Sequence, residues 1–265
     1  MNPAAMAPFG AALAAYDAGD DAAEIIVRRD DGNEARLPMN LFFRDEPAFT
    51  AMEQAALARC TGRVLDIGAG AGLHSLALQR RGLRVTAIDI SPSARDLAKR
   101  RGVIDARCAD IMVFDDGPFD TLLMLGHGIG MVETIAGLRA FLAKAGPLMT
   151  SGGQLLLDSM DVRATIDPAH LAYHEANRAE GRYIGEIRMQ FQFDWRVGPF
   201  CGWLQIDPET LSAEAARLGW RTEVIHSGAH GGYLASVTKP PQVESPRDTR
   251  SAHTTSGPTR SAPEP

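Results

Sequence analysis

Short apolar runs alternate with stretches of helical periodicity through the middle of the chain, from Thr61 to Leu157. This alternation is typical of βαβ units that build a parallel sheet. The run from Val64 to Ile67 predicts a buried strand, and the helical pattern after it ends at Gly82. Further strands are predicted at 85–90, 103–108, 120–125 and 154–158, with helices at 91–101 and 132–145 and a turn at 115–118 before the strand at 120–125. The pattern therefore predicts a doubly wound α/β fold with helices on both faces of the sheet.

The pattern changes on both sides of this central region. A helical stretch at 170–177, an alternating run at 183–195 and a short run at 203–206 predict a small antiparallel insertion spanning 162–206. Beyond it, a helix starts at Asp207-Pro208 and strands follow near 222–225 and 233–237. Before the central region, Asp30-Asp31-Gly32 predicts a hairpin turn.

These changes predict three parts: an N-terminal cap of helix and hairpin over residues 1–60, a main domain over 61–240, and a tail over 241–265. Ser, Thr, Pro and Arg make up most of the tail. Because such a segment buries too little apolar surface to offset the entropy of ordering, we expect it to be disordered.

Charge and cysteine content narrow the classes of partner. With 33 acidic and 27 basic residues, the net charge of -6 disfavours a broad grip on a nucleic-acid backbone. The cysteines are Cys60, Cys108 and Cys201; they form no CxxC pair, so neither a disulfide framework nor a zinc site is predicted. No export signal or membrane-spanning run is evident, and we expect a cytoplasmic protein without a membrane partner. The sequence does not indicate an oligomeric state.

A glycine-rich turn between the first central strand and its helix carries the chemistry. It reads Asp66-Ile67-Gly68-Ala69-Gly70-Ala71-Gly72, and glycines here let a ligand approach the backbone at the carboxyl edge of the sheet. A dinucleotide fingerprint would need glycine at Leu73 or at Ser75, so the pyrophosphate interpretation fails. Asp89 ends the next strand, where acids of this architecture reach a ribose diol.

The run from Val64 to Asp161 resembles the core of class I S-adenosylmethionine-dependent methyltransferases. The resemblance implies a mostly parallel, seven-stranded Rossmann-like sheet, with Tyr233 to Val237 as the antiparallel seventh strand, and makes 61–240 the cofactor-binding domain. It also implies a set of cofactor-binding residues: Asp66, Gly68, Ala69, Gly70, Asp89, Ile90, Asp110, Ile111, Leu125 and Gly126.

Each part of the cofactor has its own residues by this resemblance. The glycine turn and the backbone at Leu125-Gly126 would meet the methionine part. Asp89 would bind the ribose hydroxyls, Ile90 would pack on adenine, and Asp110 with Ile111 would hold the adenine edge.

Candidates on the acceptor side are fewer. His127 follows the fourth central strand and could act as a general base, although a packed or cofactor-facing histidine fits the sequence equally well. His170 and His174 share a helical face without an HExxH pattern, so we expect no metal site. Three aromatic residues alternate in one strand, with Trp203 on its expected partner strand: Phe191, Phe193 and Trp195. Such a face is more often a small core than a substrate cup; as a cup it would favour a planar or apolar acceptor.

The resemblance implies methyl transfer by direct displacement, with S-adenosyl-L-methionine as cofactor and S-adenosyl-L-homocysteine as product. Leu125-Gly126-His127-Gly128 differs from the Asn/Asp-Pro-Pro-aromatic pattern of enzymes that methylate nucleic-acid bases. We therefore favour an oxygen or nitrogen of a small molecule as acceptor. Two alternatives stay open: a protein or peptide acceptor, and a non-catalytic regulatory subunit that binds the cofactor. An enzyme needs open space beside His127, which a pure binding protein could fill.

Overall fold

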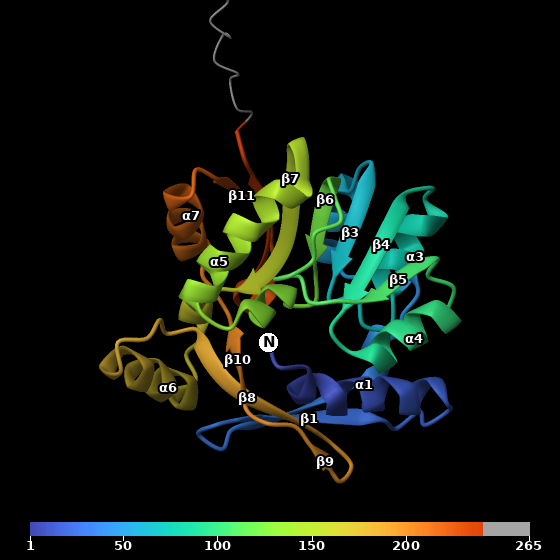
Figure 1. The fold of residues 1–265 in the computed structure, drawn as a ribbon. Coiled ribbons are helices and arrows are strands. Elements are labelled where there is room, and N and C mark those ends of the chain that lie inside the picture. Colours follow the sequence, from blue (N-terminus) through green and yellow to red (C-terminus); the bar gives the residue numbers. More distant parts are fainter. Residues whose placement is uncertain (241–265) are drawn as a thin grey trace, which may run out of the picture.

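The computed structural model describes residues 1–240, and the predicted tail at 241–265 lies outside the described residues. The molecule contains two β-sheets with helices packed against them (Figure 1). The larger has seven strands in the order β11-β12-β7-β6-β3-β4-β5. Their bounds are β3 Arg63–Ile67, β4 Arg84–Asp89, β5 Asp105–Cys108, β6 Phe119–Met124, β7 Met149–Met160, β11 Arg221–Ser227 and β12 Gly232–Thr238.

The larger sheet is mostly parallel, as the sequence predicts. Strands β3, β4, β5, β6 and β7 pair in parallel. Strand β12 pairs antiparallel with β7, opposite Leu157 at Ala235, and β11 pairs antiparallel with β12. The prediction of an antiparallel strand at 233–237 is confirmed.

Alternating side chains on β6 show how helices cover both faces of the larger sheet. Leu122 and Met124 belong to the core shared with α5 (Ile135–Ala145) and α7 (Pro208–Arg217). Leu123, and Leu125 directly after the strand, belong to the core shared with α2 (Ala51–Arg59) and α3 (Leu73–Arg80). Because successive side chains of a strand point to opposite faces, one strand contributes to two hydrophobic cores.

The smaller sheet joins segments that lie far apart in the sequence. It runs β10-β8-β1-β2, with β9 paired to β8. Strands β1 (Glu24–Arg29) and β2 (Glu34–Pro38) form the predicted N-terminal hairpin. The others come from the predicted insertion: β8 (Glu186–Phe193), β9 (Arg196–Val197) and β10 (Cys201–Leu204). Val27 of β1 lies opposite Phe191 of β8, so the N-terminal hairpin and the insertion share one antiparallel sheet.

Helix α1 (Pro3–Asp17) packs on this smaller sheet and on α4 (Pro92–Arg100). Figure 1 shows α1 and the smaller sheet beyond the carboxyl ends of the parallel strands. The remaining α-helix, α6 (Pro168–Ala179), lies beside β8. None of the helices within residues 1–240 combines the length and the apolar character needed to span a membrane.

One detail of the sequence-based prediction is wrong. The alternating run does not carry Trp195 onto the face of Phe191, because β8 ends at Phe193 and Asp194 turns the chain with a φ of 56°. The side chain of Trp195 is consequently exposed. Phe191 and Trp203 do pack together, with ring centroids 6.1 Å apart.

Candidate functional site

A cavity of about 1290 Å³ lies where the carboxyl ends of the parallel strands meet α1 and the smaller sheet. It is lined by His127 and by nearly all of the predicted cofactor residues: Gly68, Ala69, Gly70, Asp89, Ile90, Asp110, Ile111, Leu125 and Gly126. Asp66 is the predicted cofactor residue that does not line the cavity in the described part of the chain, because it is buried behind the glycine turn. Its Oδ2 accepts a hydrogen bond of 2.6 Å from Ser75 Oγ, and burial raises its pKa.

Asp89 is held at the end of β4 by two backbone donors. Gly70 N–H donates to Oδ2 at 2.9 Å and Ser91 N–H donates to Oδ1 at 2.8 Å. Burial raises the pKa of Asp89, and these two hydrogen bonds oppose that rise. A carboxylate has about four lone-pair positions, so one on each oxygen is left for a pair of neighbouring hydroxyls. This geometry fits a ribose diol.

Two further features fit an S-adenosylmethionine-like ligand. Asp110 Oδ1 accepts the Met112 N–H at 2.9 Å, which orients the carboxylate and leaves Oδ2 free to accept from an amino group. Gly126 follows β6 with a φ of +69°, and no atom lies within 4 Å of where its Cβ would be. Backbone and cavity therefore meet there without a side chain between them.

His127 begins a 3-10 turn over Gly128–Val132 in the left-handed conformation, with a φ of 59°. Such a backbone is costly for a residue with a Cβ and needs support from its surroundings. Asp158, at the end of β7, provides that support, because the His127 N–H donates to Asp158 Oδ1 at 2.9 Å and to Oδ2 at 3.2 Å. Asp158 is buried, which raises its pKa, while the adjacent His127 opposes the rise.

A cluster of polar side chains lines another part of the cavity. Glu53 Oε1 lies 3.0 Å from His74 Nε2 and accepts a 2.8 Å hydrogen bond from Arg44 Nη2. The Thr50 N–H donates to Glu53 Oε2 at 2.7 Å, completing a capping box at the start of α2. The sequence did not single out Glu53, His74 or Asp158, because local patterns do not show which strand and helix ends meet.

Aromatic side chains form the wall on the side of the smaller sheet. Trp203 and Phe191 of that sheet line the cavity together with Phe9 of α1. Met131 lines it beside the glycine turn, because a Cβ at Gly68 would lie 2.7 Å from Met131 Cε. Phe9 also packs edge-on against Phe191, with centroids 6.2 Å apart. The aromatic face predicted from the sequence is thus both a small core and a cavity wall.

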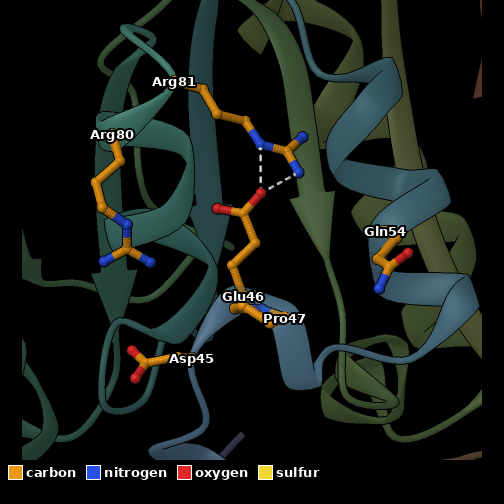
Figure 2. A pocket seen from close by; sticks show the side chains of 6 residues that line it. All are labelled: Asp45, Glu46, Pro47, Gln54, Arg80 and Arg81. Atoms are coloured by element: carbon orange, nitrogen blue, oxygen red, sulfur yellow. Dashed lines mark hydrogen bonds and ion pairs between the residues drawn. The ribbon is translucent and has the colours of Figure 1, made fainter.

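A second pocket of about 790 Å³ lies on the outside, between α2 and the end of α3 (Figure 2). Figure 2 shows Glu46 accepting hydrogen bonds from Arg81, whose Nε is 3.0 Å away. The lining is Asp45, Glu46, Pro47, Gln54, Arg80 and Arg81. These residues include none of the predicted site residues, so we place the chemistry in the larger cavity.

Comparisons with known proteins agree with this geometry. A family model described as a methyltransferase domain matches residues 64–153. The chain is 36% identical to an S-adenosylmethionine-dependent methyltransferase from Bacteroides fragilis, whose crystal structure contains S-adenosyl-L-homocysteine. That alignment has a TM-score of 0.79 and covers 91% of this chain and 98% of the other.

Two curated relatives match over shorter regions. The ubiquinone biosynthesis O-methyltransferase of Xylella fastidiosa (strain 9a5c) is 32% identical over 107 residues, covering 37% of this chain and 42% of that protein. The demethylmenaquinone methyltransferase of Tropheryma whipplei (strain Twist) is 34% identical over 99 residues, covering 36% and 40%. The matches therefore span about two fifths of the length of these relatives.

Proposed function

This chain belongs to the S-adenosylmethionine-dependent methyltransferases, and on that premise we propose that it methylates an oxygen or nitrogen of a small-molecule acceptor by direct displacement. The observation that carries the proposal is the open cavity beside His127. Its volume of about 1290 Å³ exceeds the roughly 300–1,000 Å³ of a site for one drug-sized ligand. A cofactor at the glycine turn would therefore leave room for an acceptor.

The residues of the cavity divide between the two ligands. Asp89 would hold the ribose and Asp110 the adenine amino group, because both carboxylates keep free lone pairs. The backbone at Gly126 would meet the methionine part, because no atom occupies the position of its missing Cβ. Asp66 would act from behind the turn, through Ser75. The wall of Phe191 and Trp203 then faces the acceptor and favours one with a planar or apolar portion.

When bound, S-adenosylmethionine supplies a methyl group from a sulfonium, whose positive charge disappears as the new bond forms. The main task of this chain is to align the acceptor with that methyl group, since well-oriented reactants reach effective molarities of about 10⁵ M or more. His127 would take the acceptor proton, which is worth about 10²-fold in rate.

The alternatives are less well supported. A non-catalytic cofactor-binding subunit does not require open space beside His127, yet the cavity extends there. A protein or peptide acceptor would have to reach between α1, the smaller sheet and the strand ends, which line the cavity from opposite sides. We therefore favour a small molecule.

Calorimetric titration with S-adenosylmethionine, S-adenosylhomocysteine and NAD tests the proposal. We expect the first two to bind and NAD not to bind. Asp89→Ala should weaken binding at least about 10-fold, because a hydrogen bond to a charged group contributes about 1.5–3 kcal/mol. Asp116→Ala, at an exposed carboxylate paired with Arg107, is the matched control and should bind like the wild type.

Failure of the wild-type protein to bind either sulfur ligand, or a preference for NAD, would overturn the assignment. Binding would justify a screen of small acceptors for release of S-adenosylhomocysteine. Methylation of peptides but of no small acceptor would replace our proposal with the protein-acceptor alternative.

A further inference from the structure

Three observations converge on the carboxylate of Asp158. It accepts the backbone N–H of His127, it is buried at the end of β7, and its Oδ2 lies 3.9 Å from His127 Nδ1. The β7 strand lies directly beside β6, with Met124, the last residue of β6, opposite Leu157. Asp158 therefore lies next to the turn after β6, which contains His127. The contact therefore follows from the parallel pairing of β6 with β7.

The His127 ring has one buried and one open edge. Nδ1 is buried and has no hydrogen-bond partner among the residues that the structure describes. Because 42% of the side chain is nevertheless exposed, the open edge is the one that carries Nε2. His127 lines the cavity, so this edge faces the space left for the acceptor.

We propose that Asp158 is a positioning residue that holds His127 with its proton on Nδ1 and with Nε2 free to accept a proton from the acceptor. The proposal rests on the proposed function and adds a role for Asp158. A distance of 3.9 Å is too long for a hydrogen bond. Hydrogen bonds of catalytic groups are often long before the reactants bind and shorten in the complex, and we expect the same of this one.

The proton transfer accompanies the displacement. His127 Nε2 takes the proton of the attacking atom while that atom bonds to the methyl carbon and the carbon–sulfur bond breaks, its electron pair remaining on sulfur. The positive charge that appears on the ring then lies beside the Asp158 carboxylate, which stabilises it. An acceptor hydroxyl gains most from this arrangement, because its oxygen is a weak nucleophile until the proton leaves.

Other side chains with titratable or charged groups line the same cavity: Arg36, Arg44, Glu53, His74, Asp89, Asp110, Glu133, His226 and His230. Burial raises the pKa of Asp158. Among these groups, His74 carries a charge that lowers this pKa, as His127 also does. It already has a partner in Glu53 at 3.0 Å. Among the described residues, Asp158 provides the carboxylate that lies within 4 Å of a ring nitrogen of His127.

The test is the position of the His127 ring proton, measured by ¹⁵N NMR of the full chain labelled at histidine, at a pH where the ring is neutral. The spectrum of His127→Gln assigns the signal. We expect wild-type His127 to carry its proton on Nδ1. In Asp158→Asn the amide oxygen still accepts the His127 N–H, while the amide NH₂ faces Nδ1 and moves the ring proton to Nε2.

Asp116→Asn, the same change at an exposed position, should leave the His127 signal as in the wild type. A wild-type His127 ring protonated on Nε2 would overturn the proposal. This measurement uses the wild-type protein and so does not depend on the folding of a variant. An Asp158→Asn spectrum identical to that of the wild type would overturn it as well.

Calorimetry with S-adenosylhomocysteine separates this proposal from the proposed function. Asp158→Asn should bind within about 2-fold of the wild type, since Asp158 is not among the residues assigned to the cofactor. If the wild type binds no cofactor but shows the Nδ1 proton, the proposed function fails while the Asp158–His127 arrangement stands. If the wild type binds the cofactor but carries the His127 proton on Nε2, the proposed role of Asp158 fails while the proposed function stands.

Discussion

At the scale of single residues, Glu53 links the stability of the cavity wall to pH. Burial raises the pKa of Glu53, but hydrogen bonds, foremost with His74 and with the Thr50 N–H, outweigh it and lower the pKa to about 2 from an ordinary 4.5. A carboxyl group with a lower pKa in the folded state stabilises the fold above pH 4.5. This contribution is lost as the pH falls from 4.5 towards 2.

We therefore expect Glu53→Gln to lower the free energy of unfolding at pH 7 by up to about 3 kcal/mol. Its deficit relative to the wild type should shrink by more than half at pH 3, where the wild type has lost most of the same contribution. Urea unfolding at both pH values measures the difference. Glu175→Gln, at an exposed position of α6, should stay within about 0.5 kcal/mol of the wild type. A deficit equal at the two pH values would contradict the assigned pKa.

Gly130 permits close packing in the turn after His127. A Cβ at this position would lie 2.1 Å from Cε2 and Nε1 of Trp203, so any side chain displaces the indole from the cavity wall. We expect Gly130→Ala to cost about 1–3 kcal/mol in urea unfolding, as overpacking does, and to change the tryptophan fluorescence. Gly146→Ala is the control, because its Cβ would meet Lys239 Nζ at an ordinary 3.7 Å. Unchanged stability of Gly130→Ala would show that Trp203 does not pack over this turn.

At the scale of elements, the sequence predicted what short-range patterns encode. The strand predicted at 64–67 is β3, the helix predicted to start at Asp207-Pro208 is α7, and the hairpin turn at Asp30-Asp31-Gly32 connects β1 and β2. Each depends on neighbours in the sequence: an apolar run, a cap with proline, a glycine turn.

Long-range pairing was not predictable in this way. The register that places Ile26 opposite Gln192 joins distant segments by backbone hydrogen bonds, which any two extended strands can form. The same reason hid the role of Asp158. Its sequence context shows only a strand residue, and the available signal was an acid near the carboxyl end of a strand expected beside β6.

The position of β1 inside the smaller sheet gives a prediction for this element. Val27 lies opposite Ala35 on one side and Phe191 on the other, so its N–H belongs to one of the two ladders. Val27→Pro removes that donor and should cost at least about 1–3 kcal/mol in urea unfolding. Because α1 packs on β8 and lines the cavity with Phe9, we also expect about 10-fold weaker binding of S-adenosylhomocysteine by calorimetry.

Val27→Ala removes most of the side chain but keeps the N–H, and should bind the ligand more tightly than Val27→Pro does. Wild-type affinity in the proline variant would mean that the smaller sheet does not support the cofactor site.

At the scale of the whole molecule, the two sheets share one cavity, and a ligand that fills it should stabilise both. S-adenosylhomocysteine at 100 times its dissociation constant should add about 2.7 kcal/mol, or about 5–10 °C in the melting temperature of a chain of this size. Hydrogen exchange locates the effect. It should slow in peptides that contain the turn after β6, at 125–128, and in peptides of β8, and stay unchanged in α6, whose residues lie outside the cavity lining. Asp89→Ala, expected to bind at least about 10-fold more weakly, should gain at most about 1.4 kcal/mol at the same ligand concentration and show correspondingly less protection. Protection confined to the turns of the larger sheet would instead mean that the smaller sheet opens independently and acts as a lid over the bound cofactor.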